Sequence, residues 1–475
     1  MPAVECTHLI GGHAVGRPRV RRANPAEPGD AVSIRPEGGP EQAAAAVSAA
    51  VQTQAAWAAT PAPARGAVLR RASQLLGERA EQVALDLCRE EGKTLAEARG
   101  EVARAGDVLA YFGGEGWRPF GHVVPSSVAN TLIYTRREPL GVVACITPWN
   151  FPIAIPAWKI APALVAGNAV VFKPASLTPL TAYHFVCALQ DAGLPAGVLN
   201  LVYGGSLLGD ALVADPRVAG ISFTGSTSVG SHIHSVASAR RARLQLEMGG
   251  KNPLVVLDDC DPEFAASVAA IGGFGLTGQA CTATSRVICT PGIYEGLVAA
   301  LVAQAARYRP GDGRTADVLM GPVVSEDQMT RDREAVAQAR SDGARTVVGG
   351  RAIDGLLFEP TVIQGVRREQ AMWREEVFGP IIAVARADDP TQAIAMANDT
   401  AYGLAAAIVT NDLEQAARFA ERVQAGVVKV NRPTTGLELS APFGGMKDSS
   451  TNTFREQGWV ATEFFSTSKT VYLGW

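Results

Sequence analysis

The sequence lacks an excess of charge of either sign. Its 475 residues include 43 lysines and arginines and 46 aspartates and glutamates, and only 19% of the residues are charged. A nucleic-acid coat needs a strong basic excess, so we expect no nucleic-acid partner. The apolar fraction of 47% excludes a disordered chain. At roughly 100–200 residues per domain, the length predicts two to four domains.

Cysteine pairs and long apolar runs are missing as well. The seven cysteines form no Cys-x-x-Cys pair, which argues against a disulfide framework and against a zinc site. We therefore expect no metal and a reducing, cytoplasmic location. The first residues show no secretory pattern, and the most apolar stretch, residues 141–172, is interrupted by Asn150, Lys159 and Asn168. We expect no membrane partner, because a spanning helix needs about 18 uninterrupted apolar residues.

Strand-like and helix-like segments alternate along most of the chain. Residues 40–110 are predicted to be helical, because apolar side chains recur there at helical spacing. Beyond them, β-branched runs at 141–146 and 169–172 alternate with helical stretches such as 178–192. This alternation predicts βαβ units around parallel sheets, and two α/β domains that meet near Gly249–Gly250. The pattern continues with expected strands at 219–224, 254–257 and 381–385, expected helices at 262–275 and 389–397, and a final β-rich tail.

Three residues suit thiol chemistry, and each also has a purely structural interpretation. Cys281 follows Gly278, where a turn or helix N-terminus would favour the thiolate, although most cysteines are simply buried. Glu247 precedes Gly249–Gly250 between apolar residues, where desolvation would raise its pKa toward that of a general base; alternatively it ends a helix or joins a salt bridge. Asn150 follows a strand, and its amide could donate to an oxyanion or hydrogen-bond its own turn.

Seven motifs in order decide between these interpretations. They are Thr147–Pro–Trp–Asn–Phe–Pro152, Lys173–Pro–Ala–Ser176, Phe223–Thr–Gly–Ser–Thr227, Glu247–Met–Gly–Gly–Lys–Asn252, Gly278–Gln–Ala–Cys281, Glu376–Val–Phe–Gly–Pro380 and Pro442–Phe–Gly–Gly445. With them, the chain resembles the aldehyde dehydrogenase superfamily from about residue 10 to its C-terminus. The spacings of 34 residues from Glu247 to Cys281 and 95 from Cys281 to Glu376 also suit that family.

The resemblance implies an α/β architecture with three parts. A Rossmann-like NAD(P)-binding domain would comprise residues 1–120 and 140–248, and an α/β catalytic domain residues 249–450. A small β oligomerisation arm would comprise residues 121–139 and 459–475. The terminal strand at 469–473 suits pairing with a sheet of another subunit, so we expect a homodimer or homotetramer.

The resemblance also implies a mechanism. The Cys281 thiolate would attack a small-molecule aldehyde, with the oxyanion held by the Asn150 amide and the Cys281 backbone N–H. Hydride transfer would leave a thioester, which water activated by Glu247 would hydrolyse. Lys159 and Glu456 match two further polar positions of the family and would relay protons from Glu247.

The cofactor residues implied by the resemblance surround a strand-to-helix turn. Gly225 and Ser226 would face the pyrophosphate, Lys173 and Glu376 would hold the two riboses, and Phe378 would pack beside the nicotinamide. Many NAD-preferring relatives carry a glutamate where this chain has Ser176, so we expect NADP to be preferred, with NAD possible. The remaining expected cofactor residues are Ile146, Thr147, Pro148, Trp149, Ala175 and Gly249.

A narrower resemblance indicates the substrate. Residues 153–159, 281–286 and 431–436 are similar to 2-oxoglutaric semialdehyde (2,5-dioxopentanoate) dehydrogenases, whereas the succinic semialdehyde branch usually has an arginine where Trp158 stands. Ser285, Arg432 and the backbone around Thr434 are candidates to bind a distal carboxylate.

Several alternatives remain open. One is a broad-range aldehyde dehydrogenase with an apolar funnel of Phe151, Trp158 and Phe443. Others are a CoA-acylating relative, which the presence of Glu247 disfavours, a thiol-dependent binding module, and an inactive structural homologue.

Overall fold

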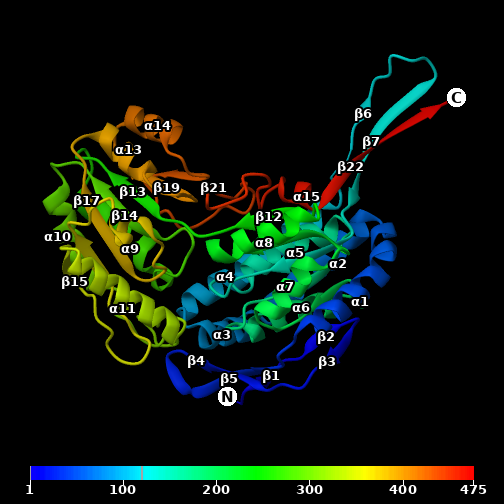
Figure 1. The fold of residues 1–475 in the computed structure, drawn as a ribbon, viewed down its shortest axis with the longest axis horizontal. Helices are drawn as coiled ribbons and strands as arrows, with labels where there is room; N and C mark the ends of the chain where they lie inside the picture. Colours follow the sequence, from blue (N-terminus) through cyan, green and yellow to red (C-terminus); the bar gives the residue numbers. More distant parts are fainter. Residues whose placement is uncertain (1, 119–120) are drawn as a thin grey trace.

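The computed structural model describes residues 2–118 and 121–475 and contains two seven-stranded sheets, each covered by helices on both faces (Figure 1). The first sheet belongs mainly to the first half of the chain. Its strands, in order across the sheet, are β12 (Arg243–Glu247), β11 (Val218–Thr224), β8 (Val142–Ile146), β9 (Ala169–Lys173), β10 (Leu199–Leu201), β2 (His8–Ile10) and β3 (His13–Val15). The first five run parallel, and β2 and β3 add an antiparallel edge.

Alternating side chains of the first sheet face two separate cores. Val143 and Cys145 of β8 pack in one core, and Val142 and Ala144 pack in the other, because successive residues of a strand point to opposite faces. The first core is completed by α2 (Ala62–Glu78), α3 (Ala80–Glu91), α4 (Leu95–Glu115), α5 (Ala154–Val165) and α6 (Pro179–Asp191). The second is completed by α1 (Pro40–Ala59), α7 (Ser206–Ala214) and α8 (Thr227–Ala239).

The second sheet follows the same plan. Its strand order is β15 (Arg345–Val348), β16 (Thr361–Gln364), β17 (Ile381–Arg386), β14 (Thr284–Cys289), β13 (Asn252–Val256), β19 (Ala405–Val409) and β20 (Val427–Val430), and only β15 is antiparallel to its neighbour. One face packs on α9 (Pro262–Phe274) and α10 (Tyr294–Ala305). The other packs on α11 (Glu326–Ser341), α12 (Ala371–Arg374), α13 (Pro390–Asn398) and α14 (Leu413–Arg422).

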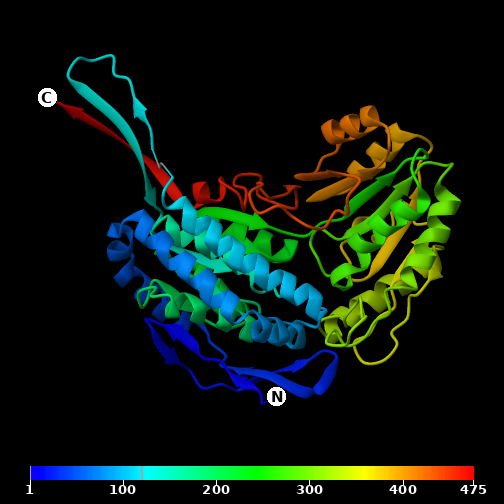
Figure 2. The same ribbon diagram turned by 180° about the vertical axis from the view of Figure 1, so that it is seen from behind.

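The chain passes from the first sheet to the second between β12 and β13, across Gly249–Gly250, where the sequence analysis places the domain boundary. The functional bounds assigned there, 1–120 with 140–248 and 249–450, stay predictions. Residues 1, 119 and 120 within them lie outside the described residues. A three-stranded sheet of β1 (Val4–Glu5), β5 (Glu27–Arg35) and β4 (Val20–Asn24) lies near the N-terminus (Figure 2).

The tail after α13 contains more strands than helices, as predicted. Its strands are β18 (Tyr402–Gly403), β19, β20, β21 (Met446–Lys447) and β22 (Ser466–Gly474), and its helices are α14 and α15 (Ala461–Phe464). α14 forms because Asp412 caps it, accepting from the backbone N–H groups of Glu414 and Gln415, and because Phe419 is buried. In the described part of the chain, no helix is long and apolar enough to cross a bilayer.

A three-stranded ribbon projects from the body (Figures 1 and 2). It consists of β22 (Ser466–Gly474), β7 (Thr131–Pro139) and β6 (Val123–Val124), with all nine residues of β22 paired to β7. The terminal strand therefore pairs along one side with β7 of its own chain, and its predicted pairing with a sheet of another subunit stays a prediction. Its outer edge has no strand partner among residues 2–118 and 121–475.

Candidate active site

Cys281 lies in a turn between the 3-10 helix η1 (Gly275–Gly278) and β14. The turn is rigid, because Asn252 Nδ2 donates to the carbonyl oxygens of Cys281 (2.8 Å) and Ala283 (2.9 Å). Gly278 has φ +66° and approaches Gly379 so closely that a Cβ atom would lie 2.2 Å from its carbonyl oxygen. A side chain at position 278 would therefore displace the turn that holds the nucleophile.

Asn150 lies in the loop between β8 and α5 and is buried. Its Nδ2 atom donates to the Gln279 carbonyl oxygen at 2.9 Å, two residues before Cys281, and one amide hydrogen remains for an oxyanion. The loop is held by a buried ion pair: Lys93 Nζ lies 2.6 Å from Glu101 Oε2 and donates to the Asn150 carbonyl oxygen at 2.7 Å. Glu101 Oε1 accepts from the N–H of Ile153 at the start of α5 (3.0 Å).

Glu247 ends β12 and is buried. Its Oε1 atom accepts from Ser450 Oγ, and its Oε2 atom accepts from the Gly445 N–H, both at 3.1 Å. Burial raises the pKa of Glu247 well above its ordinary value, the direction predicted from the sequence, and the nearby Glu456 carboxylate adds to the shift. A carboxyl group with a raised pKa is a suitable general base for water.

Lys159 and Glu456 form a second buried ion pair behind Glu247. Lys159 Nζ also donates to Ser222 Oγ (3.0 Å), and Trp158 Nε1 donates to Glu456 Oε2 (2.8 Å). Lys159 lowers the pKa of Glu247 and Glu456 raises it, so both charges are close to the base. The predicted relay residues are therefore paired with each other and lie within electrostatic reach of Glu247.

The pKa of the Cys281 thiol differs from the expectation. Burial raises its pKa to about 12, and the carboxylates of Glu376, Glu247 and Glu456 raise it further. The backbone N–H of Thr282 lowers it, but by less. The turn alone therefore does not favour the thiolate as predicted, because desolvation and three acidic neighbours outweigh it.

The carboxyl ends of four parallel strands meet at one edge of the first sheet. Ile146 pairs with Lys173, and Thr224 pairs with Glu247, so the residues that follow these strands lie together. Strand order reverses on either side of β8, and such a switch point is where open α/β sheets bind ligands. Ile146 ends β8, and Thr147, Pro148 and Trp149 continue from it into this edge.

This edge holds polar groups that the chain itself leaves unpaired. Thr147 Oγ1 and Thr224 Oγ1 are buried without a hydrogen-bond partner in the described part of the chain. Gly225 follows Thr224, and Ser226 caps α8, accepting from the Val229 N–H at 3.4 Å. Unpaired hydroxyls beside a helix N-terminus fit the sugar and phosphate oxygens of a nucleotide.

Lys173 adds a cation to the same edge. Among the residues that the structure describes, its ammonium makes no hydrogen bond and no ion pair. Burial lowers the pKa of Lys173 to about 8, with Arg35 contributing. Ala175 and the exposed Ser176 follow it in the loop after β9. A ribose hydroxyl or phosphate would satisfy this ammonium.

Glu376 and Phe378 approach this edge from the second sheet. The Gly250 N–H donates to Glu376 Oε1 at 2.9 Å, and a Cβ atom on Gly249 would lie 2.2 Å from Glu376 Oε2. Burial raises the pKa of Glu376 to about 7. Phe378 has φ +65° and packs edge-on against Trp149, with ring centroids 5.6 Å apart.

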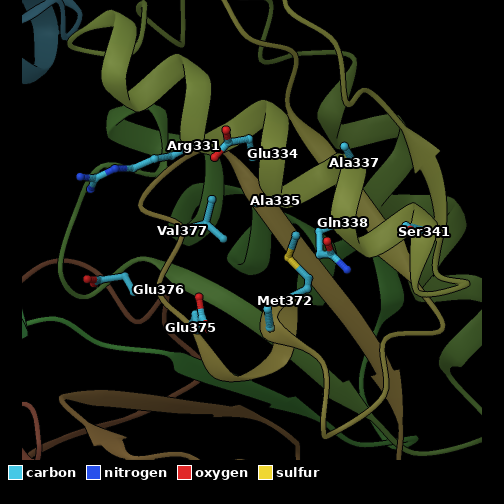
Figure 3. A pocket seen from close by; sticks show the side chains of 11 residues that line it. Arg331, Glu334, Ala335, Ala337, Gln338, Ser341, Met372, Glu375, Glu376 and Val377 are labelled. Carbon is cyan, nitrogen blue, oxygen red and sulfur yellow. The ribbon is translucent and has the colours of Figure 1, made fainter.

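Glu376 also borders a cavity of about 800 Å³, which lies between α11 and α12 (Figure 3). The carboxylate of Glu376 extends away from Gln338 and Met372 of that cavity. Cys281 does not line it, so we place the reaction in a second cavity.

That second cavity, of about 390 Å³, contains Cys281 in its wall. The predicted residues Phe151, Trp158 and Phe443 line it. Ser285 does not: its hydroxyl faces the Asn252 carbonyl oxygen (3.4 Å). The other lining residues are Glu97, Gly100, Glu101, Arg104, Ala154, Ile155, Ile271, Gly275, Leu276, Ala280, Thr282, Thr435, Gly436 and Leu437.

Arg432 lines a neighbouring cavity beyond the 435–437 loop, so the structure does not bring it to the substrate side of Cys281. Thr434 is buried and its hydroxyl contacts Thr284 Oγ1 (2.8 Å). Sequence analysis missed Arg104, which lies on α4 with Glu97, Gly100 and Glu101. These four residues share one helical face, which their spacing in the sequence predicts. The spacing does not indicate that this face lies beside Cys281.

A half-buried thiol in the wall of an apolar cavity lies close to an amide donor and a buried carboxyl base, beside a strand edge that suits a nucleotide. Together these features define a thiol oxidoreductase. Residues 14–471 match the aldehyde dehydrogenase family. The chain belongs to this family and is an NAD(P)-dependent oxidoreductase that acts on an aldehyde.

Two relatives and two solved structures illustrate the similarity. The chain is 47% identical to 2,5-dioxopentanoate dehydrogenase of Saccharolobus solfataricus, over 90% of this chain and 91% of that one. It is 47% identical to alpha-ketoglutarate semialdehyde dehydrogenase of Haloferax volcanii, over 94% of each chain. An NADP dependent enzyme of E. coli superposes with TM-score 0.95 at 34% identity, covering 99% of this chain and 98% of that one. A betaine aldehyde dehydrogenase of Staphylococcus aureus in complex with NAD+ gives the same TM-score and identity, covering 98% and 97%.

Proposed function

We propose that the protein oxidises 2-oxoglutaric semialdehyde to 2-oxoglutarate with NADP. The observation that carries the chemistry is the proximity of Asn150 and Glu247 to Cys281: the Asn150 amide donates to the Gln279 carbonyl oxygen two residues before Cys281, and the Glu247 carboxylate acts on the pKa of the Cys281 thiol. The names of the Saccharolobus and Haloferax relatives support the substrate. The cavity of about 390 Å³ has the size for a five-carbon chain and an apolar wall for its methylene groups.

The reaction begins at the thiol. Cys281 Sγ attacks the aldehyde carbon, and the new oxyanion accepts hydrogen bonds from the Asn150 amide and the Cys281 N–H. When bound, the nicotinamide supplies the hydride acceptor and a positive charge beside the thiol. Loss of hydride from the thiohemiacetal carbon leaves a thioester on Cys281. Lys93 and Glu101 keep the Asn150 loop in place throughout.

The thioester is then hydrolysed. Glu247 takes a proton from water, the resulting hydroxide attacks the thioester carbon, and the C–S bond breaks to release the acid and the Cys281 thiolate, which begins the next turnover. Lys159 and Glu456, through the network with Ser222, pass the proton on from Glu247. The buried position of Glu247 keeps its pKa high enough to accept that proton.

The residues at the strand edge fit the cofactor. Thr147, Thr224 and Lys173 would hold its polar groups, the α8 N-terminus with Gly225 and Ser226 its pyrophosphate, and Glu376 the nicotinamide ribose. Ser176 carries no charge that would repel a 2′-phosphate, and Lys173 lies near, so NADP is preferred over NAD.

Comparing substrates tests this function. The purified enzyme is given 2-oxoglutaric semialdehyde, hexanal and benzaldehyde, with NADP or NAD and with or without CoA. The proposal expects kcat/KM for the dioxo acid to exceed that for hexanal by about 10–100-fold, with free acid as product. Equal or better turnover of hexanal or benzaldehyde favours a broad-range enzyme, and a CoA requirement favours acyl transfer.

We also propose a cytoplasmic homodimer or homotetramer assembled through the β22–β7–β6 ribbon. Val123, Tyr472 and Trp475 expose apolar area on this ribbon, and the outer edge of β22 is free of a strand partner in the described ranges. An exposed apolar edge of this kind invites pairing with a copy of itself. Light scattering should give at least twice the 49.6 kDa chain mass; a monomer contradicts the proposal.

A further inference from the structure

We propose that Arg104 is the residue that binds the distal carboxylate of the substrate and sets specificity for an acidic aldehyde. The inference rests on the proposed function, because it takes the substrate to be a short oxo acid. Arg104 lies on α4 and lines the cavity that contains Cys281. Among the described residues that line this cavity, it is the one cation.

The hydrogen bonding of Arg104 leaves it available for a ligand. A guanidinium has five N–H donors. Within the described ranges, Arg104 makes one hydrogen bond, from Nη2 to Gln457 Oε1 at 2.9 Å. Gln457 is fully buried, and its backbone follows that of Glu456 in the proton relay. Gln457 thus fixes one end of the guanidinium while the other donors stay unpaired.

The other charged groups that line the cavity are acids, and protein donors already engage them. Glu97 accepts from the Leu276 N–H (2.7 Å) and from Thr94, and Glu101 accepts from Lys93 and from the start of α5. The nearby Lys429 donates to the carbonyl oxygens of Thr435 and Gly436. The two glutamates would repel a substrate carboxylate, and Lys429 already uses two of its three donors.

Two acids lie near Arg104 without pairing with it. Asp107 and Glu438 interact with its charge, but in the described part of the chain neither forms an ion pair with it within 4 Å. A planar guanidinium can bind a carboxylate through two parallel hydrogen bonds, which also orients the chain of the substrate. An apolar cavity with one such group at its wall suits an aldehyde that carries a carboxylate at its other end.

The test compares Arg104→Met with Arg99→Met. Methionine retains an unbranched apolar side chain, and Arg99 lies on the same helix but is exposed and paired with Glu81 (2.9 Å). With Arg104→Met, kcat/KM for 2-oxoglutaric semialdehyde relative to pentanal should fall about 10–100-fold, mainly through KM. Arg104→Lys should retain part of the preference for the dioxo acid over pentanal, and Arg99→Met should retain all of it.

Inhibition gives a second readout that does not depend on the true substrate. With pentanal as substrate, 2-oxopentanoate supplies the same acid end without an aldehyde, and Arg104→Met should raise its inhibition constant about 10–100-fold. If wild-type enzyme prefers the dioxo acid but Arg104→Met changes neither the ratio nor the inhibition, only this inference is overturned. The inference is also overturned if Arg104→Met lowers kcat/KM equally for pentanal and for the dioxo acid. It is likewise overturned if Arg432→Met, and not Arg104→Met, abolishes the preference for the dioxo acid. If wild-type enzyme shows no preference for the dioxo acid, the proposed function fails; unchanged inhibition by 2-oxopentanoate in Arg104→Met then removes the inference as well.

Discussion

The two sides of Cys281 use their polar groups differently. On the cofactor side, Thr147 Oγ1, Thr224 Oγ1 and Lys173 Nζ have no hydrogen-bond partner in residues 2–118 and 121–475. On the substrate side, Glu97 and Glu101 are fully engaged by protein donors, and the wall is otherwise mostly apolar. A buried polar atom without a partner costs about 1–3 kcal/mol. The cofactor side is therefore completed by a polar ligand, whereas the substrate side receives an apolar chain with a charge at one end.

Replacing the nucleophile should abolish the reaction, although both binding sites remain. Cys281→Ala should reduce NADPH formation by at least about 10⁴-fold, because no thiohemiacetal forms without the thiol. The melting temperature should stay close to wild type, since alanine differs from cysteine by one buried atom. Absorbance of the reduced cofactor measures NADPH formation, and calorimetry measures the melting temperature. Near-normal turnover in a folded variant contradicts the assignment of Cys281.

Replacing the base separates hydride transfer from acid release. Glu247→Gln keeps the size of the side chain but cannot accept a proton from water, so steady-state turnover should fall about 10²–10⁴-fold. A burst of NADPH close to one per active site should survive in rapid mixing, because the thioester still forms. Burial raises the pKa of Glu247, so wild-type turnover should rise with pH as this carboxyl ionises.

The variant should lose that rise with pH. Glu326→Gln, an exposed glutamate at the start of α11, is a control that should change neither the burst nor the pH profile. Loss of the burst together with turnover would place Glu247 before hydride transfer instead.

A change confined to the cofactor side should leave the substrate side intact. Ser176→Glu introduces a carboxylate into the loop after Lys173, where it would repel a 2′-phosphate and accept from ribose hydroxyls. The ratio of kcat/KM for NADP to that for NAD should fall about 10–100-fold, with KM for the aldehyde unchanged. Ser176→Ala should shift the ratio much less. An unchanged ratio in Ser176→Glu removes the argument for NADP.

The same contrast explains what the sequence could predict. The catalytic and cofactor residues follow strands, as Asn150 follows β8 and Lys173 ends β9, and parallel strands bring their carboxyl ends to one edge. Local motifs therefore predicted them. The substrate wall is assembled by tertiary packing: Arg104 and Gln457 are 353 residues apart in the chain. No local pattern joins them, and the position of Arg432 in a nearby loop does not determine which cavity its side chain enters, so its role stays a prediction.

The strand alternation that predicted the cores also explains the position of Ser285, whose role in substrate binding stays a prediction. It lies on β14 between Thr284 and Arg286, and its hydroxyl contacts the neighbouring strand's backbone at Asn252. The raised pKa of Cys281 could not be predicted either, because it depends first on burial and then on three carboxylates from the 375–380 loop, β12 and the C-terminal segment.

The smallest expected effect concerns a buried acid behind the cofactor side. Asp332 of α11 accepts from Gln328 Nε2 (2.9 Å), which also donates to the Val377 carbonyl oxygen (2.9 Å) beside Phe378. Asp332 Oδ2 has no hydrogen-bond partner in the described ranges, and burial raises the pKa of this carboxyl to about 7. In the unfolded chain, an aspartate has a pKa of about 3.9.

Between these two pKa values the folded state binds the proton and the unfolded state does not, so stability falls as pH rises from about 4 to about 7. Asp332→Asn carries no charge at any pH and escapes this loss. Its melting temperature should exceed that of wild type by roughly a few degrees at about pH 8, with the difference shrinking toward about pH 4. Glu334→Gln, an exposed change on the same helix, should show no such pH-dependent difference. A shift of equal size at both pH values would mean that the asparagine acts through packing and that folding does not raise the pKa of Asp332.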